Sequence, residues 1–75
     1  MTLLTRAGCH LCEQAQPVLE RICEQADAAL SVLDVDADRE LRAEYGDRLP
    51  VFLIDGWEHG YWRVEEARLR AALDG

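Results

Sequence analysis

The residues best suited to chemistry are two cysteines in the segment Cys9-His10-Leu11-Cys12. A short apolar run precedes this segment and an amphipathic pattern follows it, so we expect the pair to lie between a strand and the start of a helix. Unpaired N–H groups and the dipole at a helix N-terminus favour a thiolate on the first cysteine and lower its pKa. Two thiols at this spacing can also close into a disulfide. Their position therefore indicates thiol–disulfide redox chemistry.

The rest of the sequence predicts the elements that would position this pair. From Leu11 onward, apolar residues recur with the spacing of one helix face. Runs rich in apolar and β-branched residues indicate strands. Asp55-Gly56 is typical of a hairpin turn. The expected strands are residues 2–5, 30–35, 51–54 and 57–62; the expected helices are residues 11–26, a segment that begins after residues 36–38 and ends at Tyr45, and residues 65–73.

This order of elements, β-α-β-α-β-β-α, predicts an α/β fold. The first two strands need a helical crossover and should be parallel, whereas the hairpin adds two antiparallel strands. We therefore expect a four-stranded mixed sheet with helices on both faces. The 75 residues predict a single domain, residues 1–75, with a small core.

The composition of the chain limits its possible binding partners and its cellular compartment. The formal net charge is −7, and every basic residue is an arginine. This charge repels phosphate groups, so we expect neither nucleic acid nor a membrane as a partner. The odd number of cysteines favours a reducing compartment, and no apolar run approaches the roughly 20 residues of a membrane span. These features predict a cytoplasmic protein, and we expect it to be a monomer.

Four joined features resemble the glutaredoxin branch of the thioredoxin fold, and in particular its small glutaredoxin-like proteins. They are the first strand, the Cys9-x-x-Cys12 pair that opens a helix, Leu49-Pro50 before the third strand, and a glycine-turned hairpin before the last helix. The resemblance covers essentially the whole chain. It implies a thiol–disulfide oxidoreductase with a cis Leu49-Pro50 bond packed beside the cysteines. It also implies that no metal or organic cofactor is bound and that an external thiol recharges the site.

The sequence departs from glutaredoxins proper at three places. Those proteins usually carry Pro-Tyr between the cysteines, where this chain has His10-Leu11. They carry Thr-Val before the proline, where this chain has Arg48-Leu49, and a Gly-Gly pair after the last strand, where Gly60-Tyr61-Trp62-Arg63 stands. Because the Thr-Val position belongs to the glutathione grip of the family, we expect the reductant to be either glutathione or a thioredoxin-reductase-type system. The resemblance implies a disulfide-containing protein or glutathione as the partner.

The candidate site residues have distinct expected roles. Cys9 is the nucleophile, and Cys12 is the resolving thiol that attacks the mixed disulfide. His10 either stabilises the thiolate when cationic or is an exposed polar side chain. Leu11, Leu49 and Pro50 shape the site, with the Leu49 backbone offering hydrogen bonds to a thiol substrate. Arg6 and Arg48 either hold a substrate or glutathione carboxylate or are solvated charges.

Two other functions use the same residues. The first is a carrier of a metal ion or iron–sulfur cluster, in which a second chain, or His10 and Cys23, would complete the ligand set. The second is a non-catalytic interaction domain that keeps the fold. Cys23 lies on the apolar stripe of the first helix, where we expect a small buried side chain.

The aromatic residues and the second histidine lie near the end of the chain. We expect Trp57, Tyr61 and Trp62 to pack in the core or at the sheet edge, with a docking surface for a partner as the alternative. We expect His59 to be a surface residue of the last strand.

Overall fold

The computed structural model describes residues 1–74, and its elements follow the predicted order. A single 3-10 turn, η1, is added to the predicted set, and each other element lies within about two residues of its expected bounds. The elements are β1 (Thr2–Thr5), α1 (His10–Gln25), β2 (Ser31–Asp34), η1 (Val35–Ala37), α2 (Arg39–Tyr45), β3 (Val51–Ile54), β4 (Trp57–Tyr61) and α3 (Glu66–Asp74).

The four strands form the predicted mixed sheet, in the order β2-β1-β3-β4. β1 is parallel to β2 and antiparallel to β3, and β4 returns antiparallel to β3. In the pairing of β1 with β3, Leu4 lies opposite Val51. The end of β1 and the start of β3 therefore lie at the same edge of the sheet.

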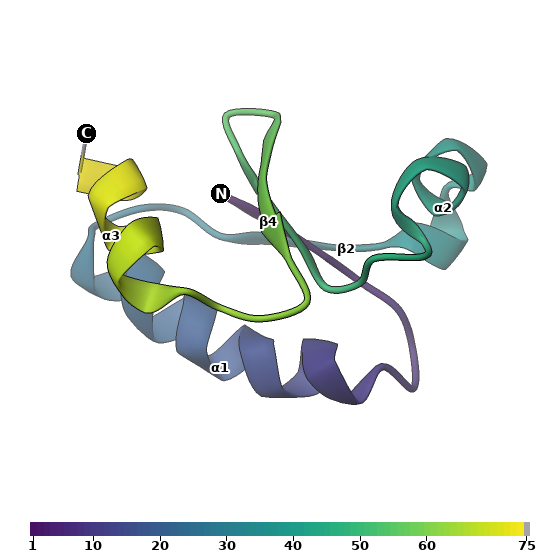
Figure 1. Ribbon diagram of the computed structural model, residues 1–75, viewed down its shortest axis with the longest axis horizontal. Helices are drawn as coiled ribbons and strands as arrows, with labels where there is room; N and C mark the ends of the chain where they lie inside the picture. The colour runs from purple at the N-terminus through teal and green to yellow at the C-terminus, as the bar shows by residue number, and fades with distance from the viewer. Residues whose placement is uncertain (75) are drawn as a thin grey trace.

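Helices cover both faces of the sheet, as predicted. Leu3 and Leu4 are fully buried and point to opposite faces, since successive side chains alternate along a strand. The Leu3 face packs against α1 and α3, with Leu19 and Leu69 in its core. The Leu4 face packs against η1 and the partly buried side chains of α2. Figure 1 shows α3 beside α1 and α2 at the far end of the molecule.

Turns and caps explain where several elements begin and end. Asp55 and Gly56 have φ values of 53° and 84°, so both central residues of the hairpin are left-handed. This conformation matches the twist of the flanking strands. The Asp38 carboxylate accepts hydrogen bonds from the Glu40 and Leu41 N–H groups at 2.9 and 3.3 Å, and it caps α2.

The last hairpin differs from the sequence-based expectation of a packed core. Its aromatic side chains are exposed, Trp57 by 80%, so they lie outside the core, and the alternative of a docking surface stays open. His59 is half-buried, and its Nε2 atom is buried without a partner in the part of the chain that the structure describes. His59 is half-buried because the register of β3 with β4 is irregular. Phe52 faces Gly60 and Leu53 faces Glu58, so His59 is an additional residue of β4. Burial and then the Arg68 charge lower the pKa of His59.

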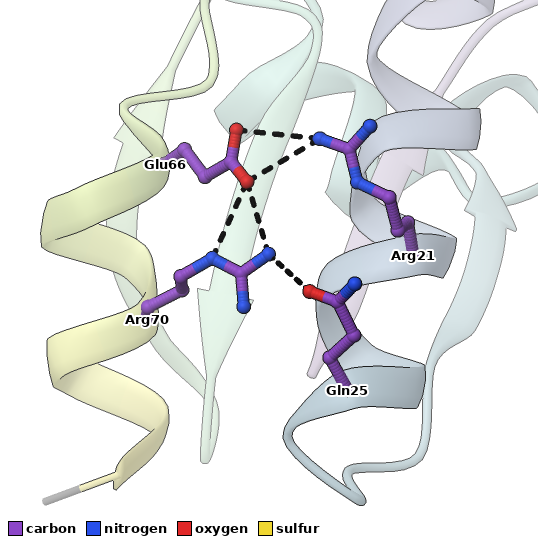
Figure 2. Close-up of polar contacts among 4 residues, drawn as sticks. All are labelled: Arg21, Gln25, Glu66 and Arg70. Carbon is purple, nitrogen blue, oxygen red and sulfur yellow. Dashed lines mark hydrogen bonds and ion pairs between the residues drawn. The ribbon is translucent and has the colours of Figure 1, made fainter.

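A polar cluster joins α3 to α1 (Figure 2). The Glu66 carboxylate accepts hydrogen bonds from Arg21 at 3.3 Å and from Arg70 at 3.0 Å, and Arg70 also donates to the Gln25 side chain. The Arg70 hydrogen bond, and then the charge of Arg21, hold the pKa of Glu66 below its ordinary value of 4.5. The cluster therefore favours the ionised carboxylate. No helix within residues 1–74 is long and apolar enough to cross a membrane.

The core on the α1 face predicts a large effect for Leu19→Ala. Leu19 is fully buried between the sheet and the helices, so we expect urea unfolding to show a loss of about 3 kcal/mol. Leu33→Ala is the control, because Leu33 is 45% exposed on the edge strand β2 and should cost less than about 1 kcal/mol. Equal losses for the two variants would contradict this packing.

The lowered pKa of Glu66 predicts a pH-dependent effect of Glu66→Gln. The carboxylate stabilises the folded state fully above about pH 4.5, and this contribution is lost as the pH falls through the lower folded pKa. The difference in unfolding free energy between wild type and variant should therefore be small but positive at pH 7 and shrink below pH 4.5. Glu44→Gln on α2 is the control. A difference that is the same at pH 7 and in acid would refute the assignment.

Candidate redox site

Cys9 is the residue that begins the first helix. It has an extended backbone (φ −84°, ψ 106°) and is the N-cap of α1, and its Sγ accepts a hydrogen bond from the Cys12 N–H at 3.1 Å. Gly8, which precedes it, has a φ of 81°, a left-handed conformation that suits glycine. The chain thus turns from β1 into α1 with the Cys9 sulfur directed at the first-turn amides. This is the position that the sequence predicted for the first cysteine of the pair.

The two cysteines are joined in a disulfide, with their Cα atoms 5.2 Å apart. The structure therefore describes the oxidised form of the pair. Cys12 is only 3% exposed and belongs to the core, whereas Cys9 is half-buried. Cys9 is thus the more exposed residue of the pair.

Leu49 and Pro50 lie at the same edge of the sheet as the segment that leads from β1 to Cys9. Pro50 is fully buried and directly precedes Val51, which faces Leu4 of β1. The Leu49-Pro50 bond is cis, as the resemblance implied. Within residues 1–74, neither the N–H nor the carbonyl of Leu49 has a hydrogen-bond partner. The predicted role of the Leu49 backbone in holding a substrate chain stays a prediction.

His10 and Leu11 lie on the first turn of α1 and are both exposed. The His10 side chain is 91% exposed, and its Nδ1 lies 3.8 Å from Glu13 Oε2. A protonated His10 would thus form an ion pair with Glu13 beside the cysteines. Its effect on a Cys9 thiolate stays a prediction.

Arg6 and Arg48 are each paired with carboxylates. Arg6 Nη2 lies 3.1 Å from Asp36. Arg48 contacts Glu58 at 3.0 Å and lies over the Tyr45 ring, and its hydrogen bond to Glu58 raises the pKa of the guanidinium. A substrate carboxylate would have to replace these partners. The role of the two arginines in substrate binding stays a prediction.

Sequence reasoning missed a groove beside the cysteines. It has a volume of about 200 Å³ and lies between α1 and the turn after β4. Trp62 in that turn has a left-handed backbone with φ 70°, an uncommon conformation for a bulky residue. The one feature of the sequence that could have indicated this groove is Leu11, an apolar residue on the first turn of the helix, where a side chain is exposed. The lining residues are Leu11, Gln14, Ala15, Val18, Trp62, Arg63 and Val64.

Cys23 is buried, as predicted, and is remote from the pair. At the rise of an α-helix, Cys23 lies about 16 Å from Cys12 along α1. Its thiol donates a hydrogen bond to Met1 Sδ at 3.6 Å, and burial raises its pKa. Cys23 therefore cannot share a metal ion with Cys9 and Cys12 of the same chain. Among residues 1–74, no group of three or more His, Cys, Asp or Glu side chains is placed to hold a metal ion.

Comparison with known proteins identifies the family. A model of the family described as "Glutaredoxin-like domain (DUF836)" matches residues 1–74. The chain belongs to this family. Uncharacterized proteins of Mycobacterium tuberculosis (Rv0508) and Mycobacterium bovis (Mb0520) are 47% identical over 76 residues, which cover 95% of this chain and 78% of theirs.

A solved structure supports the same family relationship. The X-ray structure of the Northeast Structural Genomics target protein XcR50 from X. campestris has a TM-score of 0.71 and 38% sequence identity. The match covers 97% of this chain and 93% of that chain. The predicted resemblance to small glutaredoxin-like proteins is therefore confirmed, as is the thioredoxin-like α/β fold.

The burial of the three sulfurs predicts an order of reactivity in the reduced protein. Cys9 should react first with iodoacetamide, by about tenfold or more over Cys12, because it is the more accessible and lies at the helix N-terminus. Cys23 should stay unmodified until the protein unfolds, because it is buried and its pKa is raised. Peptide mass spectrometry after timed quenching measures the order. Faster labelling of Cys12 or Cys23 would contradict it.

Proposed function

We propose that this glutaredoxin-like protein is a thiol–disulfide oxidoreductase that reduces protein or small-molecule disulfides. The observation that carries the proposal is the Cys9–Cys12 disulfide at the start of α1, in which the N-cap cysteine is the accessible one. A disulfide that closes such a short loop removes little entropy from the unfolded chain. Structural stabilisation is therefore a poor reason for this pair to exist.

Reduction of a substrate proceeds in two exchanges. The Cys9 thiolate attacks one substrate sulfur, and the substrate S–S bond breaks as a mixed disulfide with Cys9 forms. The released substrate thiolate takes a proton from solvent. Cys12, after losing its proton, attacks the Cys9 sulfur and releases the second substrate thiol. Two electrons have then passed to the substrate, and Cys9 and Cys12 are joined in the disulfide.

The surroundings of Cys9 support this division of labour. In the reduced protein the Cys12 N–H, which lies 3.1 Å from Cys9 Sγ, would donate to a Cys9 thiolate and stabilise it. Cys12 is shielded in the core and lies on the first turn of the helix, within bonding reach of Cys9. The free backbone groups of Leu49 would pair with a substrate chain in the manner of an added strand.

An external thiol restores the reduced pair. Either two glutathione molecules or the dithiol of a thioredoxin-reductase-type system would supply the two electrons. We propose that the protein works in this way as a monomer in the cytoplasm, where such reductants are kept. No metal ion or organic cofactor takes part in either exchange.

Serine substitutions separate the roles of the two cysteines. Cys9→Ser should lower disulfide reductase activity at least about 100-fold, because the nucleophile is lost. Cys12→Ser should form a mixed disulfide at Cys9 that persists. Activity is followed with hydroxyethyl disulfide and insulin, with either glutathione or a thioredoxin-reductase system as the electron donor, and the mixed disulfide is identified by mass spectrometry.

Cys23→Ala is the matched control, since it removes the buried thiol outside the site and should keep wild-type activity. Full activity in Cys9→Ser would contradict the assignment of the nucleophile. Wild-type protein that is inactive with both electron donors would contradict the proposed function itself.

A further inference from the structure

One wall of the groove follows α1 from the residue between the two cysteines. Leu11 separates the two cysteines and lines one end of the groove, and it is 48% exposed. Gln14, Ala15 and Val18 continue the lining along the same side of α1, at the i+3, i+4 and i+7 spacing of a helix face. From Leu11 to Val18 the helix rises by about 10 Å, which is the length of about three residues of extended chain. A chain in the groove would thus lie beside the turn of α1 that carries Leu11 and Cys12.

The size and lining of the groove favour peptide side chains over a cofactor. Its volume of about 200 Å³ lies below the roughly 300–1,000 Å³ that sites for small molecules occupy. The lining is mostly apolar, and it is walled on the side opposite α1 by Trp62 and Val64. Arg63 is the charged residue of the lining within residues 1–74, and its guanidinium can donate hydrogen bonds to carbonyl groups of an extended chain.

Charge argues against an anionic tripeptide such as glutathione as the preferred occupant. The protein carries a formal net charge of −7, so it repels a ligand with two carboxylates. Arg6 and Arg48, which flank the site, are already paired with Asp36 and Glu58 at 3.1 and 3.0 Å. A neutral protein segment meets neither obstacle.

Trp62 is held in place as a wall of the groove. Its N–H donates to the Pro50 carbonyl at 2.9 Å, which ties the turn after β4 to the segment that contains Leu49. Its ring packs edge-on against Tyr61 with a centroid distance of 5.0 Å, and it is 54% exposed. Glycine is the usual residue at a left-handed backbone position, but here the position is held by Trp62, whose exposed aromatic side chain lines the groove.

We propose that this groove binds a short apolar segment next to the cysteine of a protein disulfide, and so selects protein disulfides over glutathione disulfide. The inference rests on the proposed function, since the segment is presented to Cys9. Leu11, Val18 and Trp62 contact its side chains. Specificity then comes from apolar surface adjacent to the reacting sulfur, and the arginines beside the site keep their carboxylate partners.

Three disulfide substrates test the groove. One is a synthetic peptide dimer whose cysteine is flanked on both sides by leucine and valine, the second has serine and glutamine at those positions, and the third is glutathione disulfide. With the wild-type protein, kcat/KM for the apolar peptide should be about tenfold higher than for the other two, which is the lower end of what one methylene group contributes in an apolar pocket. Trp62→Gly, which tolerates the left-handed backbone, should bring the ratio of apolar to polar peptide close to one.

Trp57→Ala is the matched control, because Trp57 is an exposed tryptophan of the same hairpin that does not line the groove. It should leave the ratio unchanged. A wild-type ratio near one, or an equal loss in Trp57→Ala and Trp62→Gly, would overturn the inference while leaving the proposed function intact.

A binding measurement separates the groove from the chemistry. The same two peptides, with serine in place of cysteine, are titrated into the oxidised protein by calorimetry. The apolar peptide should bind at least about tenfold more tightly than the polar one to wild type, and this preference should be lost in Trp62→Gly. Equal affinities in wild type would overturn the inference even if the protein reduces disulfides. Failure of wild type to reduce any of the three substrates would instead overturn the proposed function.

Discussion

The pairing of β1 between β2 and β3 is the constraint on which the rest of the structure depends. β1 lies inside the sheet, and its two central residues, Leu3 and Leu4, are fully buried on opposite faces. One leucine joins the core under α1 and α3, and the other joins the core beside α2. A slip of one residue would exchange these faces and expose both cores.

The same register determines the geometry of the site. Because Leu4 faces Val51, the segment that follows β1 and the Leu49-Pro50 segment that precedes β3 lie at one edge of the sheet. The first segment ends at Cys9, where α1 begins. In the second segment, the Pro50 carbonyl accepts a hydrogen bond from the N–H of Trp62, which lines the groove along α1. Core packing thus places the cysteines, the free backbone of Leu49 and the groove in one region.

Features that depend on local sequence were predictable. Asp55-Gly56 predicted the hairpin because both of its residues tolerate a left-handed backbone, and Asp38 was among the predicted caps of α2. The helix start at the Cys9–Cys12 pair followed from the apolar pattern on either side of it. The resemblance to glutaredoxin-like proteins supplied the cis bond at Leu49-Pro50, which base rates alone would have made trans.

Features that depend on contacts between distant segments were not predictable. The pairing of Arg6 with Asp36 joins residues 30 positions apart, and no local pattern indicates it. His59 is half-buried because the register between β3 and β4 shifts by one residue. The groove needs the left-handed turn at Trp62, whereas the hairpin predicted from Asp55-Gly56 placed Trp62 in the returning strand. Each of these requires the tertiary arrangement before the side chain can be placed.

The central claim is that Cys9 and Cys12 form a reversible redox couple. It is tested most directly by equilibrating the protein with dithiol buffers of known potential and measuring the disulfide fraction by alkylation and mass spectrometry. We predict one reversible two-electron transition between about −270 and −120 mV, the range of thiol–disulfide oxidoreductases. A reduction potential below about −300 mV, which is typical of structural disulfides, would contradict it.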